Sequence, residues 1–132
     1  MSERKAIQSL LNLERSLTRL GEALKEKEEN SLMIDGTIQR FEFVIELFWK
    51  SLKRLLEEEG IHTNTPRESL KQAYQAGWLH DENIWLQMLR DHNETSHVYD
   101  EEAARRIYDN IKQYYPHMVN TYELLKRNYI IE

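Results

Sequence analysis

Apolar residues recur every three or four positions along most of this chain, and no segment alternates apolar and polar residues at a spacing of two. The first spacing places side chains on one face of an α-helix, whereas the second is typical of a β-strand. Only 4 of the 132 residues are glycine and 2 are proline, so few positions can interrupt a helix. The pattern predicts an all-α protein, an antiparallel up-and-down helical bundle of about five helices.

Length and charge narrow the classes of protein that remain. A chain of 132 residues buries one modest core, so we expect a single domain over residues 1–132. Cysteine is absent, which excludes disulfide bonds and catalysis by a thiolate. The formal net charge of -5 at pH 7 repels polyanions, so nucleic acid would need a local basic patch. Charged residues among the N-terminal leucines are unlike a signal peptide or a membrane span, and we expect a soluble, cytoplasmic protein.

The first half of the chain contains two long amphipathic patterns. The first predicts a helix from Ser2 to about Glu29. The pattern then breaks across residues 30–36, and the second predicts a helix from Thr37 to Gly60, a glycine well placed for a helix C-terminus. The apolar residues of this second helix are too widely spread for one flat contact. We expect it to pack on two sides and to be the central helix.

The third predicted helix begins with a clear set of capping residues. Thr65 can cap the helix, Pro66 suits its first turn, and Glu68 suits a capping box. The helix should run to about Ala76 and end at Gly77.

Two aspartates predict the starts of the last two helices. Asp81 can cap a fourth helix, which approaches the polar run of residues 90–97. Asp100 can cap a fifth helix that extends toward Leu125, with a kink or break expected at Pro116.

The segment RDHNETSHVY, residues 90–99, is the richest in chemical groups, with two imidazoles, a guanidinium, an amide and a phenol. A histidine can move a proton at a ribose 2′-hydroxyl, while a guanidinium stabilises the charge that grows on a phosphate. These groups suit metal-independent RNA cleavage. Polar residues between two helices more often cap helix ends and contact water, so the pattern alone is weak.

A metal or cofactor site has less support. His92 and His97 are five residues apart, rather than the three or four that place two ligands on one helical face. The chain has no HExxH arrangement and no glycine-rich phosphate loop. We therefore expect neither a metal nor a cofactor.

A cluster of cations on the predicted fifth helix leaves two interpretations open. Arg105, Arg106 and Lys112 could form the local basic patch that an acidic chain would need to bind RNA or a nucleotide. They could equally pair within the helix with nearby acidic residues, namely Glu101, Glu102 and Asp109. For any one of them, the surface pair is the more common arrangement.

Three separated segments resemble a known family: IQRFEFVIELFWKSLKRLLEEEG, SLKQAYQAGWL and WLQMLRDHNETSHVYDEEAARRIYDNIKQYY. They resemble the nucleotidyltransferase substrate-binding protein family, a branch of the HEPN superfamily related to HepT-like toxins. The similarity covers nearly the whole chain, most clearly from Ile38 to Tyr115. The resemblance implies an up-and-down helical bundle that forms a homodimer, is encoded beside a minimal nucleotidyltransferase and assembles with that enzyme.

The family signature is an arginine, four intervening residues, a histidine, any residue and a tyrosine, with a polar residue directly after the arginine. On this chain the polar residue falls on Asn93, the histidine on His97 and the tyrosine on Tyr99. The arginine position falls on His92, which departs from the pattern, while Arg90 lies two residues earlier. The resemblance also implies that the partner enzyme of related toxins silences them by transferring AMP to the tyrosine.

Three hypotheses for function follow from the residues and the resemblance. The favoured one is a HEPN-type partner, a substrate-binding or toxin subunit of a minimal nucleotidyltransferase. The second is a metal-independent ribonuclease toxin that is neutralised by AMP transfer to Tyr99. The third is a non-catalytic helical dimerisation module. The candidate site residues are Arg90, His92 and His97 for catalysis, Asp91 and Asn93 for substrate binding, and Tyr99 for modification.

Overall fold

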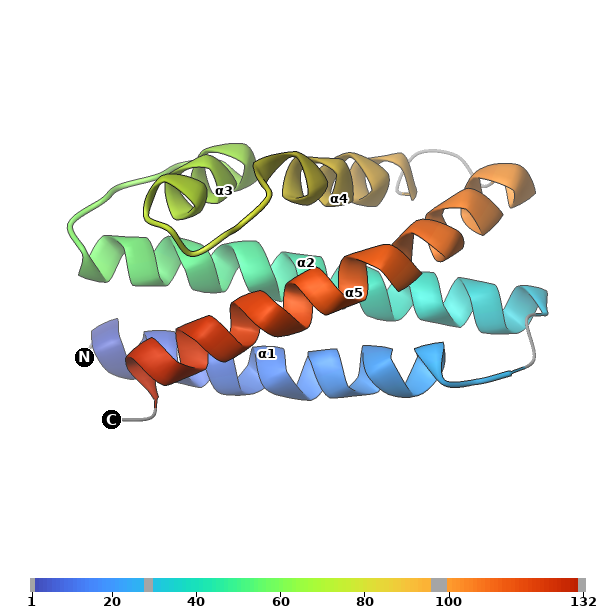
Figure 1. Ribbon diagram of the computed structural model, residues 1–132, viewed down its shortest axis with the longest axis horizontal. Coiled ribbons are helices and arrows are strands. Elements are labelled where there is room, and N and C mark those ends of the chain that lie inside the picture. Colours follow the sequence, from blue (N-terminus) through green and yellow to red (C-terminus); the bar gives the residue numbers. More distant parts are fainter. Residues whose placement is uncertain (1, 28–29, 96–99, 131–132) are drawn as a thin grey trace.

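A computed structural model describes residues 2–27, 30–95 and 100–130, and these ranges contain helices and no strand. The helices α3 and α4 follow one another along the same side of the molecule and together take the place of one long helix in the bundle (Figure 1). The all-α prediction is confirmed. None of the described helices combines the length and apolar character needed to cross a membrane. The helices are α1 (Ser2–Leu24), α2 (Ser31–Glu58), α3 (Pro66–Gln75), α4 (Glu82–Thr95) and α5 (Glu101–Tyr129).

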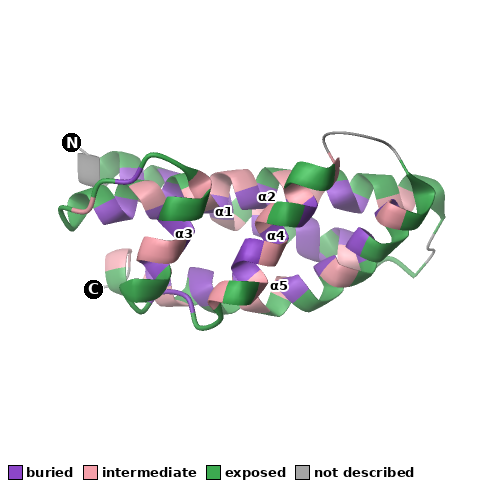
Figure 2. Cartoon of the chain, turned by 90° about the horizontal axis from the view of Figure 1, so that it is seen from above, coloured by how far each residue is buried: buried purple, intermediate pink, exposed green. Residues whose placement is uncertain are grey.

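The α2 helix contacts each of the other four helices, so the prediction that it is central is confirmed. Its inner face contributes Phe41 and Phe48, both fully buried, and the ring of Phe48 meets that of Trp85 edge-on at 4.7 Å between centroids. Each fully buried side chain of this size stabilises the fold by about 1.5–3 kcal/mol. The apolar set is wider than this core requires, because Phe43 remains 59% exposed. Figure 2 shows buried residues alternating with exposed ones along α2.

The predicted capping residues begin and end the helices as expected. The hydroxyl of Thr65 accepts a hydrogen bond from the backbone N–H of Glu68 at 3.1 Å, and Pro66 is the first residue of α3. Gly60 and Gly77 follow the ends of α2 and α3 with φ of +82° and +84°. A backbone with positive φ strains any residue that carries a Cβ, which explains why glycine occupies both positions.

The end of α1 was predicted too late. The helix ends at Leu24 rather than near Glu29. The apolar stripe stops at Leu24, and the next residues include Glu26, Glu28 and Glu29. Residues 25–29 are all charged, so the segment has no apolar face that could pack on the bundle and extend the helix.

The predicted break across residues 30–36 was wrong in its position. The α2 helix begins at Ser31 because the side chain of Asn30 caps it, accepting a hydrogen bond from the N–H of Met33 at 2.8 Å. Gly36 lies inside the helix, where a glycine costs only about 1 kcal/mol relative to alanine. One glycine was therefore too weak a signal for a break.

A break at Pro116 was also wrong, because α5 continues through this residue to Tyr129. Proline removes one helical hydrogen bond and costs about 3 kcal/mol in a helix interior. Beyond it, Met118, Tyr122 and Leu125 are almost fully buried against the rest of the bundle. Burial of three large side chains offsets that cost and keeps the helix continuous.

Candidate functional site

The motif segment lies at the junction of α4 and α5, at the end of the bundle opposite the start of α1 (Figure 1). The α4 helix ends at Thr95, and the side chain of Asp100 caps α5 by accepting a hydrogen bond from the N–H of Glu102 at 2.9 Å. Residues 96–99 lie outside the described residues, and the predictions for His97 and Tyr99 fall there. The remaining motif residues belong to the last turns of α4.

Asp91 is buried between α4 and α5, with 4% of its surface exposed. Its carboxylate accepts hydrogen bonds from the hydroxyl of Tyr114 and from the side-chain amide of Asn110, the latter at 3.1 Å. Burial raises the pKa of Tyr114, and the hydrogen bond to Asp91 raises it further. The sequence placed Asp91 among the substrate-binding candidates; the structure gives its carboxylate a role in holding α4 against α5.

Arg106 connects the same two helices at the surface. Its guanidinium donates two hydrogen bonds to the carboxylate of Glu94, at 2.8 and 2.7 Å, and lies 3.7 Å from Asp91. The hydrogen bond to Glu94 raises the pKa of Arg106. Both bonds come from one nitrogen, Nη2, which lies between the two oxygens of the carboxylate, and a hydrogen bond between two charged groups is stronger than one between neutral groups. The last turn of α4 is therefore tied to the first turns of α5 from both the core and the surface.

The other two cations of the proposed basic patch lie close to an acidic residue of their own helix. Arg105 lies 3.6 Å from Asp109, and Lys112 lies 3.9 Å from the same carboxylate. Both cations also lie over the ring of Tyr108, at 5.7 and 4.6 Å from its centroid. The interpretation as pairs within the helix holds for Arg105 and Lys112, whereas Arg106 pairs across to α4.

His92, at the arginine position of the family signature, points toward α2. Its Nε2 lies 2.8 Å from a carboxylate oxygen of Glu46, while the other carboxylate oxygen of Glu46 accepts from the indole N–H of Trp49 at 3.3 Å and lies 3.5 Å from Lys50. A carboxylate can only accept, so Nε2 carries the proton in this contact. The Nδ1 atom of His92 is buried and has no hydrogen-bond partner among the described residues.

This environment differs from the one that a catalytic arginine needs. A guanidinium is always charged and offers several donors, whereas His92 uses its Nε2–H on Glu46 and keeps Nδ1 away from solvent. The side chain therefore packs α4 against α2 and does not offer a free cationic fork at the junction.

Arg90 and Asn93, like Glu94, are exposed on α4. The positive charge of Arg90 lowers the pKa of Tyr114, against the larger opposite effect of burial. Their predicted roles in catalysis and substrate binding stay predictions.

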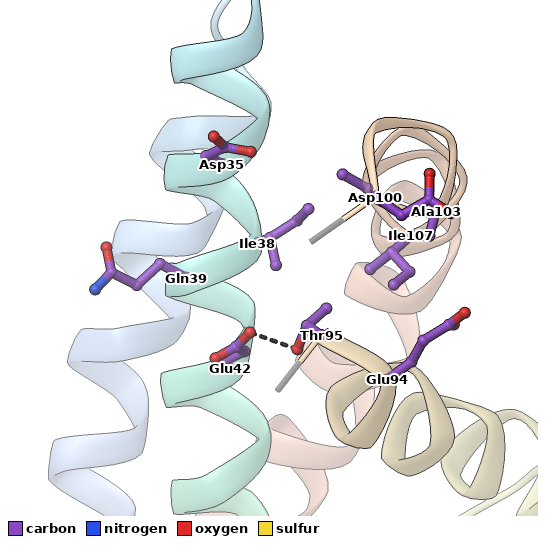
Figure 3. A pocket seen from close by; sticks show the side chains of 10 residues that line it. Asp35, Ile38, Gln39, Glu42, Glu94, Thr95, Asp100, Ala103 and Ile107 are labelled. Carbon is purple, nitrogen blue, oxygen red and sulfur yellow. Dashed lines mark hydrogen bonds between the residues drawn. The ribbon is translucent and has the colours of Figure 1, made fainter. Parts of the chain in front are cut away.

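A pocket of about 220 Å³ lies where α2, the end of α4 and the start of α5 meet (Figure 3). Thr95 of α4 reaches across to α2 at this pocket, because its hydroxyl donates a hydrogen bond to the carboxylate of Glu42 at 2.5 Å. The apolar part of the lining is Ile38, Ala103, Ala104 and Ile107, and the polar part is Asp35, Gln39, Glu42, Glu94, Thr95 and Asp100. The pocket thus opens beside both ends of the segment 96–99.

The contribution of α2 to this site was not predicted from the sequence. Glu42 and Glu46 are four residues apart on one face of α2, and both accept hydrogen bonds from the last turns of α4. Two acids four residues apart on α2 were a usable signal, but their partners lie 46 and 53 residues away. Among the described residues, no three acidic or histidine side chains lie close enough to hold a metal ion.

The chain matches the family model described as nucleotidyltransferase substrate binding protein like over residues 8–127. A curated relative from Haemophilus influenzae, named "Probable ribonuclease HepT", is 36% identical over 87 residues. This alignment covers 62% of the chain and 60% of the relative, so it spans less than two thirds of that protein's length.

Two solved structures share the fold. A crystal structure of a protein from Thermus thermophilus is 32% identical, with a TM-score of 0.80 over 86% of this chain and 98% of that chain. A structure from Haemophilus influenzae, described as revealing the fold of a substrate binding domain of a nucleotidyltransferase, is 26% identical, with a TM-score of 0.68. It covers 94% of this chain and 98% of that chain.

Proposed function

Since the chain belongs to the nucleotidyltransferase substrate-binding protein-like family, we propose that it is the helical partner subunit of a minimal nucleotidyltransferase. In this proposal the subunit forms a homodimer in the cytoplasm and presents the α4–α5 junction to the enzyme. The observation that carries the proposal is the family match over residues 8–127, which includes most of α1 and α5 and all of α2, α3 and α4. The match concerns the whole bundle rather than one short motif.

The arrangement at the junction supports a binding role. Asp91 and Arg106 tie α4 to α5, and His92 and Thr95 tie α4 to α2. These contacts hold both sides of the segment 96–99 on a rigid support. A rigid scaffold that displays one short segment is the usual way to present a recognition or modification site.

The test is coexpression with the nucleotidyltransferase encoded by the neighbouring gene, followed by affinity purification and size-exclusion chromatography. We expect both chains to elute together, at a mass that contains two copies of this chain. An unrelated nucleotidyltransferase serves as the control. Elution of the two chains as separate peaks at micromolar concentration would refute the proposal.

AMP transfer to Tyr99 is the finer part of this proposal, and it rests on the resemblance. Intact-mass measurement after coexpression should show the added mass of one AMP group, and Tyr99→Phe should remove it. An unmodified wild-type chain, purified with an active enzyme, would exclude Tyr99 as its target.

A ribonuclease is the second candidate, favoured by the curated relative named "Probable ribonuclease HepT". The pairing of His92 with Glu46 counts against it, because no guanidinium occupies the arginine position. We expect the purified chain alone to leave RNA intact and His92→Arg to raise cleavage above this background. Cleavage by the wild type that His97→Ala abolishes would establish the ribonuclease instead.

A further inference from the structure

The pocket at the α2–α4–α5 junction has a size that suits one long side chain. Its volume is about 220 Å³, whereas sites for drug-sized ligands span roughly 300–1,000 Å³. A water molecule occupies only about 30 Å³ of liquid volume, so the space exceeds that of a few ordered waters. Within the described ranges, no three acidic or histidine side chains lie close enough to hold a metal ion.

The lining of the pocket selects the charge of its occupant. No lysine, arginine or histidine of the described ranges lines the pocket. The four carboxylates that line it belong to Asp35, Glu42, Glu94 and Asp100. Arg106 neutralises Glu94, but neither Asp35 nor Glu42 has a cationic partner within the described residues. An anionic occupant such as a nucleotide phosphate would be repelled. The pocket therefore favours a cation.

The apolar part of the lining selects the shape of that cation. Ile38 and Ile107 are almost fully buried, and Ile38 extends from α2 toward the side of the pocket formed by α5 (Figure 3). Lysine and arginine place an aliphatic stem on apolar surface and keep the charged end among polar groups. An apolar wall next to carboxylates matches both parts of such a side chain.

No lysine or arginine of this chain fills the pocket within the same molecule. The chain has 18 lysines and arginines, all of them inside the described ranges, and none lines the pocket. We propose that the pocket receives one lysine or arginine side chain of the partner nucleotidyltransferase. The inference rests on the proposed function, and it adds the contact by which the enzyme is seated next to residues 96–99.

The position of the pocket favours the enzyme over a second copy of this chain. Thr95 and Asp100 line the pocket and flank the segment in which the resemblance places the enzyme's target. An enzyme anchored here through one of its basic side chains would have its surface directly over that segment. A second copy would have no such reason to insert a cation at this point.

The test removes charge without changing volume. In the double variant Asp35→Asn with Glu42→Gln, the amide oxygen of the new glutamine can still accept the hydroxyl of Thr95. The matched control is Glu57→Gln with Glu123→Gln, two exposed acids that do not line this pocket. Calorimetric titration with the purified nucleotidyltransferase should give an affinity weaker by about tenfold or more for the double variant, and unchanged for the control.

The outcomes of this titration separate the inference from the proposed function. If the wild type does not bind the enzyme, the proposed function fails and the inference falls with it. If the wild type and the double variant bind equally, the proposed function stands and the inference fails. If the double variant changes only self-association, measured by sedimentation, the occupant is a second copy and the inference is overturned.

A second measurement tests the pocket without the enzyme. Butylguanidinium, titrated into the isotope-labelled wild-type chain, should shift the amide resonances of Ala103 and Ala104 in a saturable manner, and the double variant should lose the response. Butanesulfonate has the same stem and the opposite charge, so it should leave these resonances in place. Equal shifts with both probes would overturn the charge argument.

Discussion

Replacement of Asp91 by alanine tests how the end of α4 is held. The carboxylate accepts hydrogen bonds from Tyr114 and Asn110 and is only 4% exposed. Hydrogen bonds to a charged group contribute about 1.5–3 kcal/mol each, and a buried donor left without a partner costs about 1–3 kcal/mol. The hydroxyl of Tyr114 would be such a donor, whereas Asn110 is only partly buried and can turn to water. We expect Asp91→Ala to lower the free energy of unfolding by ~3 kcal/mol.

A double-mutant cycle isolates the bond between the carboxylate and the phenol. Tyr114→Phe keeps the ring in the core and removes only the hydroxyl, so we expect a loss of ~1.5 kcal/mol. In the double variant Asp91→Ala with Tyr114→Phe, no buried phenol is left unpaired, and the total loss should stay near ~3 kcal/mol. The two changes should therefore be less than additive by ~1.5 kcal/mol.

Urea unfolding measures each free energy. It is followed by circular dichroism at about 222 nm, where the signal reports the helical backbone. Asp109→Ala is the matched control, because Asp109 is 54% exposed and its ion pairs with Arg105 and Lys112 lie at the surface. Exposed pairs contribute about 0–1 kcal/mol, so this control should unfold almost like the wild type. A loss below ~1 kcal/mol for Asp91→Ala, or strict additivity in the cycle, would show that the buried carboxylate does not hold the two helices together.

Two further substitutions test the packing of α5. A Cβ at Gly21 would collide with the phenol of Tyr115, so Gly21→Ala should lower the melting temperature. In a Tyr115→Ala background the same change should raise the melting temperature, because alanine has a higher helix propensity than glycine. Equal effects in both backgrounds would contradict the collision. Burial, then the hydrogen bond to Glu14, raises the pKa of Tyr122, so its contribution to stability is complete below about pH 10 and is lost as the pH rises toward the folded-state value. Stability should fall less steeply above about pH 10 in Tyr122→Phe than in the wild type, while Tyr74→Phe, at an exposed position, should keep the wild-type slope.

The helices could be predicted from the sequence wherever a local signal decides the structure. Thr65, Asp100 and Gly77 act through neighbours within three residues or through their own backbone, and all three ended or began helices as expected. The errors occurred where distant packing overrode a local signal. Pro116 alone predicts an interruption, but the buried residues beyond it keep α5 in one piece.

The candidate site could be located from the sequence but not assembled from it. The motif lies at the end of α4, beside the pocket, and the structure confirms that Asp100 caps the next helix there. It gave no information on Glu42 or Glu46, because these side chains reach the motif only through the packing of α2 against α4. The motif residues lie on different faces of α4. His92 therefore contacts α2, whereas Asp91 contacts α5.

The charges at this end of the bundle bear on the choice between an RNA site and a protein contact. RNA binding needs cations that are available to phosphates, and each such contact releases counterions. Here Arg106 is engaged by Glu94 and His92 by Glu46, and the pocket beside them is lined by carboxylates. In a chain with a net charge of -5, this local field has the same sign as the whole molecule. A basic protein surface would meet favourable charges at the junction, whereas a polyanion would be repelled both at long range and at the site. Binding to the nucleotidyltransferase should consequently weaken as salt is added. An affinity independent of ionic strength would mean that these carboxylates do not face the partner.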